Sequence, residues 1–237
     1  ILIFPSMNLG MTVPLDTTGE ASGVFESGPP EIDPVKMLRI HGYRDMDKVR
    51  PIIRRTAETI SKRAAEVMAP VIHFRRVGVE ACSGEDLRLV NGLKFQNAAF
   101  SKYLSCAVEI SVVVITLGKA LDDEVMGRME DDAFEPLEAL FLETAGWLGI
   151  EWTTRMFSVY LGDLIKPEGL RLTRRMGPGY SYKINGDETM WSLQQQHQLF
   201  EVFDGEDLPV RLLESCAMMP KMSRSGLYGL VPVNGEY

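Results

Sequence analysis

The chain has 237 residues, of which 45% are hydrophobic and 24% are charged, and its formal net charge is −8. These values are ordinary for globular proteins, so a fibre and wholesale disorder are excluded. The acidic balance and the lack of a basic stretch argue against a nucleic-acid partner, and the longest apolar run, Ile110 to Leu117, is too short to span a membrane.

The first segment predicts little regular structure. Residues 1–30 contain four prolines and four glycines, a composition that favours turns. We therefore expect an irregular arm over 1–30 and one domain over 31–237. The domain should begin with a short helix from Ile32 to His41, because Asp33 is a candidate N-cap and Pro34 suits the first helical position.

A second helix and a group of strands follow. Asp45 or Asp47 is expected to cap a helix that continues to about Ala69, since apolar residues recur there every three or four positions. The elements expected after it are a strand at 71–80, a turn at Asn91-Gly92, a short helix at 96–104 and a buried strand at 106–117.

Two further helices are expected in the middle of the chain. The segment 121–131 is acidic and is either a solvated helix face or a docking surface. The segment 134–164 is the longest helical one, in which Gly146 and Gly149 would let another element approach closely. Its candidate inward residues are Leu137, Leu140, Phe141, Leu148, Trp152, Met156 and Tyr160.

The last third of the chain differs in composition from the rest. An Arg- and Gly-rich stretch at 171–180 precedes an expected helix at 189–203 and strands at 210–214 and 226–233. Because helices and strands do not alternate strictly, an α+β fold is favoured over a doubly wound parallel sheet.

No metal site is expected in this chain. Its histidines, at 41, 73 and 197, and its cysteines, at 82, 106 and 216, are too widely spaced for zinc or iron–sulfur ligation. An odd number of cysteines among apolar neighbours suits reduced thiols, and the start of the chain has no secretory pattern, so we expect a cytoplasmic protein.

The segment Arg174 to Tyr180 is suited to hold a small polar ligand. Arg175 can grip a carboxylate with two parallel hydrogen bonds, and the glycines expose main-chain N–H groups to the same ligand. An ordinary turn with an exposed arginine is the alternative for this string taken alone.

A second segment, from Leu212 to Tyr228, favours the ligand-binding interpretation over the ordinary turn. The motifs of the two segments occur in the order Arg-x-x-Pro-Gly-Tyr (175–180), Leu199-Phe200, Glu214-Ser215 through Met218 and Pro220, then Ser225-Gly226 and Tyr228. This order resembles that of the reactivation domain of cobalamin-dependent methionine synthase. The resemblance covers roughly 31–233 and is strongest over 171–228. It implies a central twisted antiparallel sheet with flanking helices.

The resemblance also implies a ligand and its site. The family binds S-adenosylmethionine, so Arg175 would hold the carboxylate, Tyr228 would lie across the ligand and Asp33 would take the amino group. The residues that would line the ligand are Met176, Gly177, Gly179 and Tyr180, with Glu214, Ser215 and Ser225 as further pocket candidates. No catalytic side chain is implied.

The sequence departs from the family beside this pocket. A second arginine, Arg174, precedes Arg175. Leu213 stands where the family has Thr, and a Gly-Asn loop occupies 181–187. The chain also has no cobalamin motif, so a corrinoid would have to arrive on a partner protein.

The implied function is that of a methyltransferase component. It would bind S-adenosylmethionine, dock on a corrinoid protein and support reductive methylation of cob(II)alamin in methionine synthesis or a related system, with a flavodoxin or ferredoxin-type electron donor. One alternative is a non-catalytic scaffold of such a system that has lost the ligand. Another is direct transfer of the methyl group to a small acceptor without cobalt.

Overall fold

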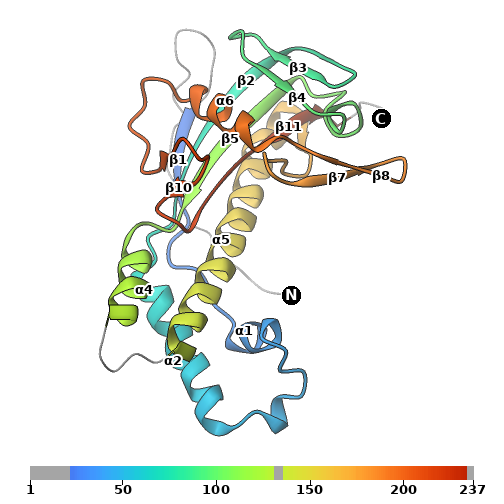
Figure 1. Cartoon of the computed structure of the whole chain (residues 1–237). Helices are drawn as coiled ribbons and strands as arrows, with labels where there is room; N and C mark the ends of the chain where they lie inside the picture. The colour runs from blue at the N-terminus through green and yellow to red at the C-terminus, as the bar shows by residue number, and fades with distance from the viewer. Residues whose placement is uncertain (1–21, 131–135, 234–237) are drawn as a thin grey trace.

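An antiparallel sheet forms the centre of the molecule in the computed structural model, which describes residues 22–130 and 136–233 (Figure 1). Its longest strands are β2 (Val71–Ser83), β5 (Glu109–Thr116) and β11 (Ser223–Pro232). Strand β5 pairs antiparallel with both of the others. Val71 of β2 lies opposite Thr116 of β5, and Leu230 of β11 lies opposite Glu109 of β5. The outer strands are β3 (Asp86–Leu89) and β4 (Lys94–Gln96) beyond β2, β6 (Leu170–Leu172) beyond β11, and β1 (Ser22–Glu26) beside the first half of β2.

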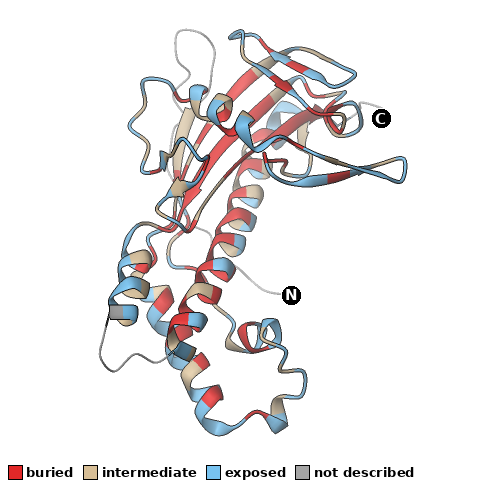
Figure 2. Ribbon diagram, viewed as in Figure 1, coloured by how far each residue is buried: buried red, intermediate tan, exposed pale blue. Residues whose placement is uncertain are grey.

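Both faces of this sheet are covered. Along β5, Val113 and Ile115 belong to one hydrophobic cluster, while Val112 and Val114 belong to a second cluster on the opposite face. Figure 2 shows the buried residues concentrated on the central strands and on the facing side of the long helix. The apolar run in β5 therefore has almost no polar alternation because neither of its faces meets water.

One long helix covers one face of the sheet. The 30-residue helix α5 (Pro136–Ile165) runs along that face and extends beyond the sheet, where it packs with α1 (Pro34–Ile40), α2 (Pro51–Val67) and α4 (Ala120–Glu130) (Figure 1). Short elements cover the other face. These are α3 (Phe100–Tyr103), α6 (Gln196–Glu201), the hairpin of β7 (Ser181–Ile184) and β8 (Asp187–Met190), and the buried side chain of Trp191.

The remaining elements are short. The 3-10 helices among the described residues span Met46–Lys48 (η1), Lys166–Glu168 (η2) and Leu193–Gln195 (η3). Strands β9 (Arg211–Leu212) and β10 (Met218–Met219) form a small hairpin. In the described part of the chain no helix is both long and apolar enough to cross a membrane. The same residues contain no group of three or more His, Cys, Asp or Glu side chains that could hold a metal ion.

Most of the predicted elements are present. The Asp33 carboxylate accepts a hydrogen bond from the Val35 amide at 2.8 Å, so it caps α1 as predicted. The strands predicted at 71–80, 106–117 and 226–233 correspond to β2, β5 and β11, and the two helices predicted after β5 correspond to α4 and α5. Residues 131 to 135, at which those two helix predictions meet, lie outside the described residues, as do 1–21 of the predicted arm.

Several predictions need correction. Residues 22–26, expected to be irregular, form β1 because they pair with β2. Asp45 caps η1, whereas α2 begins after Arg50 with Pro51 at its first position. The helix predicted at 96–104 is only Phe100–Tyr103, and the strand predicted at 210–214 is only two residues long.

The largest error is the helix predicted at 189–203. Its first two residues belong to β8, and helix α6 occupies only Gln196–Glu201. The cause is the Asn185-Gly186 pair, whose φ angles of 51° and 98° close a two-residue hairpin between β7 and β8. Trp191 is then buried against Phe95 and Phe100 and cannot continue a solvent-facing helix.

The glycines of α5 do allow a close approach. A Cβ atom added at Gly149 would lie 2.7 Å from the Met68 sulfur, and one added at Gly146 would lie 2.9 Å from Met222. Of the predicted inward residues, Phe141 and Leu148 are buried, whereas Leu140 is exposed and was wrongly assigned. The missing side chain of Gly146 lets Met222, which lies between β10 and β11, approach the helix, and this matters for the site described below.

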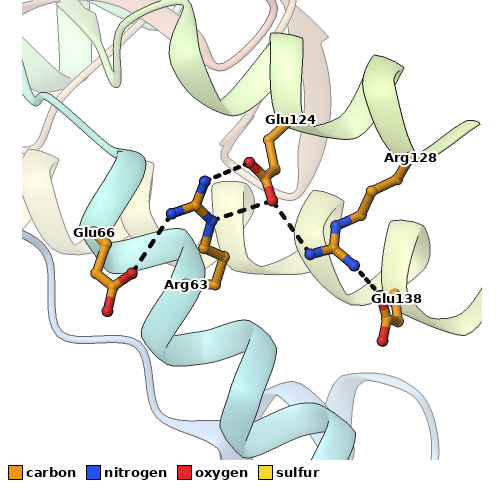
Figure 3. A network of polar contacts seen from close by, with 5 residues as sticks. All are labelled: Arg63, Glu66, Glu124, Arg128 and Glu138. Atoms are coloured by element: carbon orange, nitrogen blue, oxygen red, sulfur yellow. Dashed lines mark hydrogen bonds and ion pairs between the residues drawn. The ribbon is translucent and has the colours of Figure 1, made fainter. Parts of the chain in front are cut away.

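Charged side chains join α2, α4 and α5 where these three helices pack together (Figure 3). Glu124 accepts hydrogen bonds from Arg63 at 2.8 Å and from Arg128 at 3.2 Å. Arg128 also pairs with Glu138, and Arg63 with Glu66. These hydrogen bonds, mainly that from Arg63, hold the pKa of the Glu124 carboxyl below its usual value. The acidic helix α4 is thus partly engaged by structural contacts.

A second ionic group ties two central strands of the sheet to the segment that leads into the site. Arg76 of β2 donates hydrogen bonds to Glu168 of η2 at 2.6 Å and to Glu109 of β5 at 2.9 Å. The hydrogen bond from Arg76 lowers the pKa of Glu168 from 4.5. A carboxyl with a lowered folded-state pKa stabilises the protein above its unfolded pKa, and this contribution is lost as pH falls through the folded pKa.

The Glu168→Gln variant tests this contribution. We expect it to be less stable than the native protein at pH 7, and we expect the gap in melting temperature to close as the pH falls below 4.5. Thermal unfolding of both proteins across this range measures the gap. A constant gap would contradict the role given to the ionised carboxylate.

Candidate functional site

The segment 173–177 continues the sheet beyond β6 along the edge of β11. The Met176 amide donates to the Leu227 carbonyl at 2.8 Å, and the Leu227 amide donates back at 2.7 Å. The Thr173 amide donates to the Gly229 carbonyl at 2.9 Å. The backbones approach so closely at Gly226 that an added Cβ would lie 2.4 Å from the Met176 carbonyl oxygen. The side chain of Met176 is fully buried in the core.

The turn that follows is closed by its own hydrogen bonds. The Gly177 amide donates to the Tyr182 hydroxyl at 2.7 Å, and that hydroxyl donates to the Gly177 carbonyl at 3.1 Å. Gly179 has a φ of 81° and donates its amide to the Trp191 carbonyl at 2.7 Å. The expectation that the Gly177 amide faces a ligand is therefore replaced by a structural role, in which it fixes the turn.

Replacing Tyr182 with Phe tests how firmly the turn is held. The variant leaves the buried Gly177 amide without its partner, while the Gly177 carbonyl keeps only the Tyr180 amide at 3.4 Å, so we expect a loss of about 1–3 kcal/mol of unfolding free energy. The matched control is Tyr103→Phe, since the Tyr103 hydroxyl makes an exposed contact with the Lys183 carbonyl at 3.3 Å. The control should change stability by less than about 0.5 kcal/mol. Urea unfolding measures both, and equal losses would contradict the assignment.

Arg175 lies between this turn and β11. One guanidinium nitrogen donates to the Ser225 carbonyl at 2.6 Å, and the guanidinium carbon lies 4.9 Å from the centroid of the Tyr180 ring. The neighbouring Arg174 lies instead against Tyr103 and Tyr182, at 5.3 and 5.4 Å. The guanidinium groups of the two arginines thus have different neighbours, and only that of Arg175 joins the turn to the predicted pocket residue Ser225.

Tyr228 faces the long helix. It is only 2% exposed, and its hydroxyl forms a 2.9 Å hydrogen bond with the Ser158 hydroxyl of α5. Burial raises the pKa of the Tyr228 phenol. The phenol is therefore neutral at physiological pH, and it can offer a ligand an aromatic edge and a hydroxyl but no charge.

Two neighbouring cavities meet this group of residues along α5. The first, which we call the aromatic cavity, has a volume of about 430 Å³. Its walls include Trp147, Ile150, Gly179, Tyr180, Leu193, Met218, Met222 and Ser225. The second, which we call the arginine cavity, has a volume of about 390 Å³. Its walls include Thr154, Arg155, Ser158, Thr173, Arg175 and Tyr228. Arg175 lines the arginine cavity and stacks on Tyr180 of the aromatic cavity, so it stands at their junction.

The structure does not bring every predicted residue to these cavities. Asp33 caps α1 and lines neither of them. Glu214 and Ser215 are exposed in the turn between β9 and β10, where the Ser215 hydroxyl accepts from the Ala217 amide at 3.4 Å. The Ser215 side chain supports that turn. Of the predicted residues, those at the cavities are Arg175, Gly179, Tyr180, Ser225 and Tyr228.

The contribution of α5 was missed by the sequence analysis. Trp147 lines the aromatic cavity, and Arg155 and Ser158 line the arginine cavity. The residues 147, 151, 154, 155 and 158 recur at helical spacing, so they form one face of α5 that turns toward the cavities. A polar face interrupted by a tryptophan was the signal available in the sequence.

Comparisons with known proteins give a structural likeness. No protein-family model matches the chain, and no curated protein matches it. The fold is similar to a solved structure described as the MetH reactivation domain bound to AdoHcy, with a TM-score of 0.55 and 15% sequence identity over 91% of this chain and 80% of that chain. At this identity the likeness establishes the fold. The predicted α+β architecture with a central antiparallel sheet and flanking helices is confirmed.

Proposed function

We propose that this chain is an S-adenosylmethionine-binding domain of reactivation type. The observation that carries the proposal is the placement of Arg175 at the junction of two cavities, between the Ser225 carbonyl and the Tyr180 ring. The likeness to a reactivation domain whose structure holds AdoHcy supports the same ligand class.

The chemistry of these residues suits such a ligand. S-adenosylmethionine carries a carboxylate, a cationic amine and sulfonium, and a flat adenine ring. A guanidinium binds a carboxylate with charge-assisted hydrogen bonds, and aromatic faces attract cations. Arg175 supplies the first kind of contact, while the rings come from Tyr180, on which Arg175 stacks, and from Tyr228, which lines the arginine cavity with it. When bound, the ligand supplies an electrophilic methyl group.

The work of the chain is to position that methyl group. In the proposed reaction a cob(II)alamin on a partner protein gains one electron and the methyl group, giving methylcobalamin and S-adenosylhomocysteine. The electron would come from a flavodoxin or ferredoxin-type donor. Holding the reacting groups in line lowers the barrier without a side-chain acid or base. The corrinoid partner, the donor and a place in methionine synthesis are parts of this proposal.

Calorimetry with S-adenosylmethionine tests the proposal directly. We expect saturable heat at micromolar to millimolar ligand, with S-adenosylhomocysteine competing for the same site. If the protein gives no heat up to millimolar concentrations of either compound, ligand binding is ruled out and a scaffold role in a corrinoid system takes its place. Methyl transfer to a small acceptor by the isolated protein would instead favour the cobalt-free alternative.

A further inference from the structure

Trp147 is unusual among the tryptophans of this chain. It is 65% exposed, although an indole ring is one of the largest apolar surfaces a protein can bury. Trp191, by contrast, is fully buried between Phe95 and Phe100. In the described part of the chain Trp147 contacts no other aromatic ring. Its indole is therefore not part of the core and is available to a ligand.

The close packing at the residue before Trp147 accompanies the position of Trp147 at the wall of the aromatic cavity. The neighbouring Gly146 has no side chain, and an added Cβ there would lie 2.9 Å from Met222. This close approach brings the loop ending at Met222 against α5, so that Trp147 and the loop line one cavity. Tyr180, which is 45% exposed, lines the same cavity from the turn at 177–180.

The charged and amide groups of the aromatic cavity are already engaged. Arg224 bonds Glu151 at 2.7 Å, Lys221 bonds Glu143 at 2.5 Å, and the Gln196 amide donates to the Cys216 carbonyl at 3.1 Å. The surfaces left to a ligand include the rings of Trp147 and Tyr180, the thioethers of two methionines, and the aliphatic side chains of Ile150 and Leu193. Such surfaces select flat, polarisable groups over anions.

From this arrangement we infer that Trp147 is a specificity-determining residue that stacks on the flat heteroaromatic ring of the ligand. The inference rests on the proposed function in naming that ring as adenine. It assigns the adenosyl end to the aromatic cavity and the amino-acid end, with its carboxylate on Arg175, to the arginine cavity.

The test separates the two ends of the ligand. Adenosine, L-methionine and S-adenosylmethionine are titrated against the native protein, Trp147→Ala, Trp147→Phe and the control Trp152→Phe. Stacking on an aromatic side chain contributes enough that alanine should weaken adenosine binding by about tenfold or more, while phenylalanine should keep most of it. Methionine binding should be unchanged in all three variants. Adenosine should also quench the tryptophan fluorescence of the native protein and of Trp152→Phe, and not that of Trp147→Ala.

The outcomes distinguish failure of this inference from failure of the proposed function. If the native protein binds S-adenosylmethionine and Trp147→Ala binds adenosine equally tightly, the inference is overturned and the proposed function stands. If adenosine binds in a Trp147-dependent way and S-adenosylmethionine does not bind, the proposed function fails and the stacking role stands. If neither compound binds, both are overturned. Since Trp147 is exposed, the alanine variant should fold, and its circular dichroism should match that of the native protein.

Discussion

Arg175→Ala is expected to weaken S-adenosylmethionine binding by about 1.5–3 kcal/mol, because it removes a charge-assisted pair with the carboxylate. This corresponds to roughly ten- to 150-fold in Kd. Arg175→Lys keeps the charge and loses the planar fork, so its affinity should fall between those of the native protein and the alanine variant. Calorimetry at fixed pH and salt measures all three.

The control for this prediction is Arg174→Ala. Both arginines line the arginine cavity, yet the Arg174 guanidinium lies against Tyr103 and Tyr182 rather than against Tyr180. Its removal makes the same change in net charge, so an effect of charge alone would weaken both variants equally. We expect Arg174→Ala to bind within about twofold of the native protein, as is usual for exposed charges. An Arg175→Ala protein of native affinity would remove the assignment of this arginine.

Gly226→Ala is expected to have the largest effect on the fold of the site. An added Cβ would lie 2.4 Å from the Met176 carbonyl oxygen and 2.7 Å from the Arg175 guanidinium. The first neighbour is backbone and cannot rotate away, so the paired hydrogen bonds between Met176 and Leu227 must separate. We expect a loss of about 3 kcal/mol, at the upper end of overpacking effects. Since Arg175 is displaced as well, ligand binding should be lost.

Gly162→Ala is the matched control. Gly162 lies inside α5, and an added Cβ there would meet only the Leu172 side chain, at 4.0 Å. Alanine is the better helix former, so this variant should be unchanged or more stable by up to about 1 kcal/mol. Urea unfolding measures both variants. The close approach at Gly226 would be contradicted if both glycine variants unfolded at the same urea concentration as the native protein and bound ligand normally.

The core of the fold could be predicted because its signals are local. β-branched residues at 110–117 give a buried strand, and Asp33-Pro34 gives the start of α1. The hairpin was missed although Asn185-Gly186 is a strong turn signal, since the apolar residues after it suggested a helix. Strand β1 could not be read from its sequence, because its structure depends on pairing with β2, about 50 residues away.

The residues of the site also fall into those placed by local sequence and those placed by tertiary packing. Arg175 and Tyr180 are five residues apart on one turn, so their proximity follows from local sequence. The positions of Trp147 and Ser158 depend on the packing of α5 against a loop and a strand about 70 residues later. No local pattern specifies such contacts. Asp33 shows the opposite case, in which a residue suited to a ligand by its chemistry is used to cap a helix.

A crystal structure of the protein with S-adenosylmethionine tests the central claim most directly. It should show the ligand along α5 with its carboxylate on the Arg175 guanidinium and its adenine against Trp147. A structure in which Arg175 points to bulk solvent, and in which protein side chains fill the space between Tyr180 and Tyr228 while the ligand lies elsewhere, would contradict it.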